Sequence, residues 1–404
     1  MRQRQSTVSW RNVTRSAVQW LVQAMQWSTQ NAAVGPELLI QLLVRAAAEM
    51  RSLSAIVAEI GTGPSYEQIR TVLLSLLPCD PIDLLPATTR ALQKRLPKAL
   101  ARRPRTAAID THLRPYYGNK RTRGIFRGQP KASTKTFFAF ATLLIIRRGQ
   151  TYTVALTPVL NNEEQTVIIE RLLQQAARAG IRIRRLLLDR GFYAAKTMLW
   201  LQERSISFII PMLRRGKKAT RKADCTGTQK FFVRGRCGWD THTWIARPRR
   251  NGRKQAALEV TVNVCMTPRS QSASRVKTKK RTPLVYACHG VHASPRKVTM
   301  WYRQRFRIET SYRQLGEGLA ATCSKNPTYR LLLVAIALVL RNLWVWLHWR
   351  HLATHTPAGR QRNLKRLPLR RLTAWLIRAL NKLLDLRPRI ANPGGQLIND
   401  NQGT

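Results

Sequence analysis

Three acidic residues each stand alone in a long segment of this sequence: Asp110 in 84–162, Asp189 in 171–202 and Glu309 in 260–316. Carboxylates are scarce throughout, since the chain holds 71 Lys and Arg residues against 19 Asp and Glu. Oxygen ligands suit Mg²⁺, which is commonly bound by one or two carboxylates completed by water and phosphate. Two such ions stabilise both the attacking and the leaving oxygen of a phosphoryl transfer. The three residues therefore predict metal-dependent phosphodiester chemistry, provided that the fold brings them together.

Each carboxylate also has a purely structural interpretation. An arginine lies four residues from Glu309 on either side, at the spacing of a helical ion pair. Asp189 is followed by Arg-Gly, which is typical of a turn. Asp110 could pair with His112 or with a nearby arginine. Taken singly, these alternatives stay open. The coincidence of three isolated acids with the elements that a metal site would use favours the metal site.

The formal net charge of +52 is the strongest property of the composition. Such an excess repels itself in the free protein and predicts a polyanionic partner, either DNA or RNA. No basic amphipathic helix is set apart as an anchor, so we expect no membrane partner.

The six cysteines form no C-x-x-C pair, which argues against a zinc site or a disulfide framework. The N-terminal residues lead into no secretory hydrophobic region, and the apolar run Leu331–Leu340 is too short to span a bilayer. We therefore expect a cytoplasmic protein that associates with the nucleoid.

Alternating apolar segments predict the elements that would position the first two carboxylates. The predicted order is a strand at 106–113, a hairpin of 136–146 and 151–160, a helix at 163–179, a strand at 181–188, a helix at 194–204 and a strand at 207–213. This order is typical of an α/β fold whose mixed sheet begins antiparallel and continues with parallel strands. Asp110 would lie on the first strand. Asp189 would directly follow a buried parallel strand, at the sheet edge where open α/β folds bind ligands.

The remaining chain divides by composition into further predicted units. They are a helical, possibly DNA-binding domain at 1–100, the first part of the catalytic core at 101–213, a β-rich insertion at 214–297, a helical completion of the core at 298–352 and a basic C-terminal helix and tail at 353–404. Ser65 and Gln68 form a capping box that starts a helix in the first unit. A helical hairpin is favoured there over a helix-turn-helix. Glu309 falls on a helix predicted at 301–315.

Three sequence blocks carry a family resemblance. They are Ala108-Ile-Asp-Thr-His-Leu-Arg-Pro-Tyr-Tyr-Gly118, Leu186-Leu-Leu-Asp-Arg-Gly-Phe-Tyr193 and Tyr302-x2-Arg305-x3-Glu309. In this order they resemble the DDE transposases of prokaryotic insertion sequences, in the group with the signature Y-x2-R-x3-E-x6-K. The resemblance runs from about residue 105 to 350 and implies an RNase H-like catalytic core interrupted by an insertion before the glutamate.

The resemblance implies roles for particular residues. Asp110, Asp189 and Glu309 would be the catalytic metal ligands for two Mg²⁺ ions, with Mn²⁺ as a substitute. Tyr302 and Arg305 would contact DNA. The lysine of the signature falls on Gly316, so the chain either lacks that DNA contact or supplies it from Arg313 or Lys325.

The activity implied is metal-dependent cleavage and strand transfer at the ends of the protein's own insertion sequence. The partner implied is double-stranded DNA, both the element ends and the target, and we expect a homodimer or larger assembly on it. Two alternatives are kept: an RNase H-like nuclease that cuts without joining, and a basic DNA-binding protein without catalysis.

Overall fold

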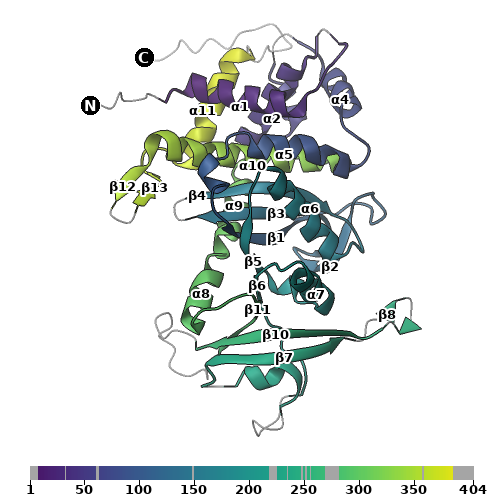
Figure 1. Cartoon of the computed structure of the whole chain (residues 1–404). Coiled ribbons are helices and arrows are strands. Elements are labelled where there is room, and N and C mark those ends of the chain that lie inside the picture. The colour runs from purple at the N-terminus through teal and green to yellow at the C-terminus, as the bar shows by residue number, and fades with distance from the viewer. Residues whose placement is uncertain are drawn as a thin grey trace, which may run out of the picture.

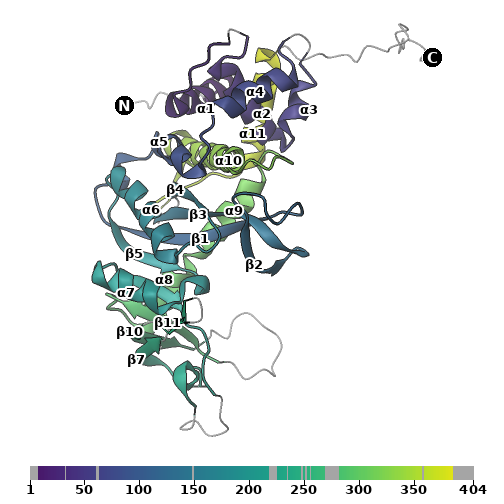
Figure 2. The same ribbon diagram turned by 90° about the vertical axis from the view of Figure 1, so that its right-hand side faces the viewer.

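The computed structural model describes residues 8–31, 33–60, 63–147, 150–217, 225–233, 235–246, 249–250, 253–254, 256–268, 282–356 and 359–384. A mixed sheet extends from the middle of the molecule to one end, and a layer of helices covers the other end (Figures 1 and 2). Both the α/β class and the helical N-terminal part are as predicted.

The described part of the sheet has nine strands. They are β1 (Arg105–Pro115), β2 (Phe126–Lys131), β3 (Thr134–Arg147), β4 (Gln150–Val159), β5 (Ile183–Leu188), β6 (Phe208–Pro211), β7 (Gly238–Ala246), β10 (Leu258–Thr267) and β11 (Leu284–His289). The strand order is β2-β3-β1-β5-β6-β11-β10-β7, with β4 paired to β3. β5 lies parallel to β1 and to β6, and the other pairs are antiparallel. The predicted antiparallel start and parallel continuation are therefore confirmed, and β2 was not predicted.

The two faces of the sheet are covered by different helices. Helices α6 (Gln165–Arg178) and α7 (Ala195–Glu203) are the crossovers between parallel strands and pack on one face. Helices α8 (Pro295–Arg303) and α9 (Phe306–Gly316) pack on the other. Because side chains alternate along a strand, Asp110 shares the face of Ala108, which packs in the cluster with Val298 and Ile308 of α8 and α9.

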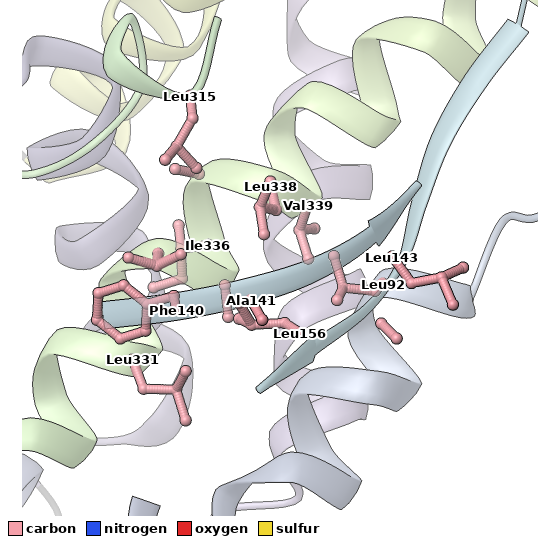
Figure 3. Packing of buried hydrophobic residues seen from close by; sticks show 14 of the residues in the cluster. Leu92, Phe140, Ala141, Leu143, Leu156, Leu315, Leu331, Ile336, Leu338 and Val339 are labelled. Carbon is pink, nitrogen blue, oxygen red and sulfur yellow. The ribbon is translucent and has the colours of Figure 1, made fainter. Parts of the chain in front are cut away.

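Helix α10 (Pro327–Leu347) is the apolar centre of the molecule. Its side chains pack on β3 and β4, where Ile336 and Val339 lie near Phe140 and Ala141 (Figure 3). With the π-helical turn η6 (His348–Leu352) that follows, α10 is long and apolar enough to cross a membrane. An 18-residue window within it has a mean hydropathy of 1.9, but 94% of that window is buried inside the protein. It therefore behaves as a core helix, as predicted for 331–340.

The helical layer combines both ends of the described chain. Its helices are α1 (Trp10–Met25), α2 (Pro36–Glu49), α3 (Leu53–Val57), α4 (Tyr66–Ser75), α5 (Leu85–Gln93) and α11 (Leu369–Leu383). The capping box of Ser65 and Gln68 is present at the start of α4. Helix α11 packs against α1 and α2 (Figure 2). The predicted tail beyond 384 lies outside the described residues.

Short elements connect these units. They are the 3₁₀ turns η1 (Pro81–Leu84), η2 (Lys98–Leu100), η3 (Arg190–Phe192) and η5 (Gly227–Phe231), and the two-stranded ribbons β8 (Arg249–Arg250) with β9 (Arg253–Lys254) and β12 (Thr354–Thr356) with β13 (Gly359–Gln361).

Two local expectations differ from the structure. The helix predicted at 301–315 is two helices, α8 and α9, because i→i−3 hydrogen bonds from the amides of Gln304 and Arg305 tighten the chain between them. The β-rich insertion does contain strands, but β7, β10 and β11 continue the core sheet through β6. Such pairing is non-local, so strand patterns in the sequence could not reveal it.

Candidate active site

Two neighbouring parallel strands place the aspartates at one sheet edge. Ile109 of β1 is paired with Leu188, the last residue of β5, so Asp110 within β1 and Asp189 just beyond β5 fall at the same level. The amide of Thr111 donates to Asp110 Oδ1 at 2.9 Å. The Asp110 side chain is 15% exposed, whereas that of Asp189 is 44% exposed. Asp110 thus forms the floor of the site and Asp189 its open side.

Helix α9 carries Glu309 over this edge and is tied to the sheet by two residues. The Tyr312 hydroxyl lies 2.6 Å from the carbonyl oxygen of Asp110, to which it donates, and 2.8 Å from Thr142 Oγ1 on β3. Arg341 of α10 donates to Gln314 Oε1 of α9 at 3.1 Å and to the Thr151 carbonyl of β4 at 3.1 Å. These bonds fix the helix relative to β1, and they thereby set the position of Glu309.

The three carboxylates meet at a single guanidinium group. Arg305 lies 3.2 Å from Asp110 Oδ2, 3.7 Å from Asp189 Oδ1 and 2.7 Å from Glu309 Oε1. Its side chain is only 8% exposed. The ion pair of Glu309 with an arginine four residues away and the pairing of Asp110 with an arginine are both present, through the same residue.

Burial controls the charge of the site's inner groups. It raises the pKa of Asp110 to about 6, with the Arg305 charge opposing the rise and the charges of Asp189 and Glu309 adding to it. Burial lowers the pKa of His112 to about 4, and the charges of Arg114 and Lys131 lower it further. The neutral His112 ring lies against Tyr312, with centroids 4.8 Å apart, so this histidine packs the tyrosine that fixes α9.

A groove of about 920 Å³ opens beside Asp189. It runs between the active-site edge and the strands of the insertion. Its described lining residues include four arginines and one acidic residue. The residues that the function can use are Asp189, Arg190, Arg214, Phe232, Arg303, Arg305 and Phe306. This basic groove with the exposed ring of Phe306 suits a nucleic acid strand, whose phosphates and bases need both kinds of contact.

A family model described as the transposase DDE domain matches residues 102–343. The chain belongs to the DDE transposase family. It is a DNA transposase, and its family consists of metal-dependent enzymes of nucleic acid cleavage and transposition.

Among solved structures, this DDE transposase is similar to a piggyBac transposase in a synaptic complex with hairpin DNA. The two chains are 12% identical with a TM-score of 0.49, over 94% of this chain and 80% of the other. At that level of similarity no residue role is carried across. No curated protein matches the sequence.

The donor set of the transposase fits a hard divalent cation. As the side chains stand, no group of three His, Cys, Asp or Glu in the described part of the chain is arranged to hold a metal ion. Asp110, Asp189 and Glu309 nevertheless all contact one cationic group, and that group is Arg305. The oxygen ligands are of the kind that Mg²⁺ prefers. The guanidinium therefore occupies the centre on which the three carboxylates converge.

The residues predicted to contact DNA lie in different environments. Tyr302 is buried, and its hydroxyl donates to the Leu188 carbonyl at 3.3 Å, although its ring borders the groove. Arg305 is buried among the acids. Arg313 is exposed on α9, one turn beyond Glu309.

Arg214 and Phe232 of the groove were not predicted from the sequence. A usable signal existed for Arg214, which lies three residues beyond the end of β6, while Asp189 directly follows β5. The two parallel strands end at the same sheet edge, so residues just beyond them meet there.

Proposed function

We propose that this transposase cleaves a phosphodiester at the ends of its own insertion sequence and joins the freed 3′-hydroxyl to target DNA. Asp110, Asp189 and Glu309 are the proposed metal ligands, for two Mg²⁺ ions with Mn²⁺ as a substitute. The observation that carries this proposal is the convergence of three carboxylates, isolated in the sequence, on one cation between β1, β5 and α9. The bound metal would supply Lewis-acid activation of the attacking oxygen and stabilisation of the leaving oxygen.

Arg305 has a role of its own in this proposal. Its single positive charge offsets part of the negative charge of the three carboxylates in the metal-free protein. The guanidinium therefore has to leave at least one of them when a metal binds. A DNA phosphate in the adjoining groove offers the guanidinium another anion, to which arginine can donate two parallel hydrogen bonds. Binding of DNA and release of the carboxylates would then favour each other.

The groove supplies the remaining contacts of the proposal. Arg190, Arg214 and Arg303 border the same space as Asp189 and would bind phosphates on either side of the scissile bond. Phe306 is 50% exposed there, so its ring is available for stacking. We further propose that Arg313 contacts DNA from α9, that the protein assembles as a homodimer or larger oligomer on DNA, and that it acts at the nucleoid.

The test is a cleavage and joining assay on DNA that carries the element's ends, with Mg²⁺ and without it. Asp189→Asn and Glu309→Gln are expected to lower both activities by more than about 100-fold, since even outer partners of metal ligands cost 10–100-fold. Asp240→Asn is the matched control, because Asp240 lies in the insertion, its side chain is 39% exposed, and it pairs only weakly with Arg236, at 3.8 Å. Full cleavage by Asp189→Asn would overturn the proposal.

The same assay separates the two alternatives. A nuclease without joining would release cut ends but leave no joined product on a target plasmid. A DNA-binding protein without catalysis would show no Mg²⁺-dependent cleavage, and its salt-sensitive binding would survive replacement of all three carboxylates.

A further inference from the structure

A second basic groove lies apart from the active-site edge. It has a volume of about 530 Å³ and is formed by the segment that follows α5 and by the end of α10 with η6. The lining residues that matter are Lys94, Arg95, Lys98, Trp346, Trp349 and Arg350.

The charge of this groove is uncompensated. Lys94, Arg95, Lys98 and Arg350 are all exposed, and none of them forms an ion pair with an acidic residue of the described chain. No carboxylate is found among its described lining residues. Four like charges around one hollow repel each other, so an external polyanion would stabilise them.

The two tryptophans hold arginines in place. The Arg95 guanidinium lies 5.5 Å from the ring centroid of Trp346, and the Arg147 guanidinium lies 5.4 Å from that of Trp349. Such cation–π contacts restrict long flexible side chains, which lowers the entropic cost of binding an anion. The tryptophan faces are thereby used by arginines, so stacking of nucleic acid bases is not their main role.

The opposite wall is anchored to the catalytic sheet. Arg105, the first residue of β1, donates through Nε to the Leu100 carbonyl at 3.1 Å and also binds the Ala99 carbonyl. Burial, and after it the charges of Arg147, Arg103 and Arg184, lower the pKa of Arg105. The surroundings of the groove are therefore positive beyond its own lining.

A short chain of contacts joins this groove to the active-site helix. Arg307, two residues before Glu309, donates to the Arg147 carbonyl at 3.0 Å, and Arg147 lies over Trp349. A DNA duplex bound at the three carboxylates and continuing past the start of α9 would therefore meet this groove next.

We propose that the groove of Lys94, Arg95, Lys98 and Arg350 binds the phosphate backbone of duplex DNA outside the cleaved phosphodiester, and so holds the flanking DNA on the protein. This proposal rests on the proposed function, because that function places DNA at the three carboxylates Asp110, Asp189 and Glu309. Its cations are point charges and guanidinium groups without a base-reading partner, so the contact is independent of sequence.

The experiment compares two doubly substituted full-length proteins. Lys94→Gln/Lys98→Gln removes two charges from the groove. Arg178→Gln/Arg204→Gln removes two exposed charges that line neither groove, and serves as the control. Binding is measured without metal over a range of salt concentrations. The probes are a long duplex with an element end, a long duplex of random sequence and a short duplex truncated beside the cleavage site.

The groove variant is expected to bind both long duplexes more weakly, with the slope of log K against log salt reduced by about 2. It should bind the short duplex as the wild type does. Equal losses in the control variant, unchanged binding of the long duplexes, or an equal loss on the short duplex would each overturn the proposal. Arg350→Gln, which should reduce the slope by about 1, provides a second variant if the double one unfolds.

Cleavage at saturating protein is measured separately with Mg²⁺. The binding assay needs no cleavage. Absence of Mg²⁺-dependent cleavage would therefore contradict the proposed function and leave the result for the groove intact.

Discussion

Arg305 lies four residues from Glu309 but 195 residues from Asp110, and it binds both. Its Nε has no hydrogen-bond partner although it is buried, so the bonds to the two carboxylates come from the terminal nitrogens of the guanidinium. The scarcity of acids allowed Asp110, Asp189 and Glu309 to be selected from the sequence. The ion-pair and metal-ligand interpretations could not be separated there, because both concern the same oxygen atoms in different states of the site.

Replacement of Arg305 tests, at the scale of one residue, whether its guanidinium and a metal ion compete for the three carboxylates. Arg305→Ala leaves three carboxylates without their cation, so we expect the metal-free protein to lose on the order of 2 kcal/mol of unfolding free energy. Fully buried pairs lose about 3–5 kcal/mol, and Asp189 and Glu309 are nearly half exposed. Mg²⁺ can then enter without displacing an arginine, so it should raise the melting temperature of the variant more than that of the wild type.

Thermal unfolding with and without Mg²⁺ measures both effects in the absence of DNA. Arg305→Lys keeps the charge but loses the planar fork. Its unfolding free energy and its Mg²⁺-induced shift in melting temperature should therefore lie between those of the wild type and Arg305→Ala. Equal Mg²⁺-induced shifts in melting temperature of wild type and Arg305→Ala would contradict the competition between Arg305 and the metal.

Helix α9 combines a predicted feature with two that were not predictable. The apolar residues Trp301, Ile308 and Leu315 recur every seven positions, which correctly indicated helix, but the same period runs through the break before α9. A local tightening by i→i−3 bonds leaves the side-chain pattern unchanged, so periodicity cannot detect it. The contact of Tyr312 with β1 likewise depends on a tertiary approach across 202 residues.

Gly316, which ends α9, gives a prediction at the scale of this element. It is exposed, and a Cβ atom built on it meets nothing within 4 Å. Gly316→Lys should therefore be accommodated, and should stabilise the helix by about 1 kcal/mol because glycine is a poor helix former and a cation suits a helix C-terminus. It would also restore the lysine of the family signature. We expect tighter binding of element ends, with the salt slope of binding increased by about 1.

Gly316→Gln is the matched control, since it shares the gain in helix propensity without the charge. If the two variants bind element ends equally well, the position does not contact phosphate. Lys325 and Arg313 would then remain the candidates for the missing contact.

At the scale of the whole molecule, alternation and helical periodicity identified most strands and helices, while the partners of the insertion strands and of the C-terminal helix stayed hidden. The insertion strands could not be assigned to the core sheet, because β11 joins β6 across more than 70 residues of sequence. Similarly, the basic composition of 353–404 indicated a separate C-terminal unit. Helix α11 instead buries Leu372, Leu376 and Leu380 and packs against the first two helices of the chain.

The packing of the two chain ends predicts that the helical layer unfolds as one unit. Leu376 is fully buried on α11, so Leu376→Ala should cost about 2–5 kcal/mol through lost burial and the cavity left behind. Leu383 lies on the same helix and is 61% exposed, so Leu383→Ala should change the unfolding free energy by less than about 0.5 kcal/mol. Hydrogen exchange reports where the loss falls: Leu376→Ala should lower protection in α1 and α2 together with α11. If α11 alone lost protection, the C-terminal helix would be a separate unit after all, as its composition suggested.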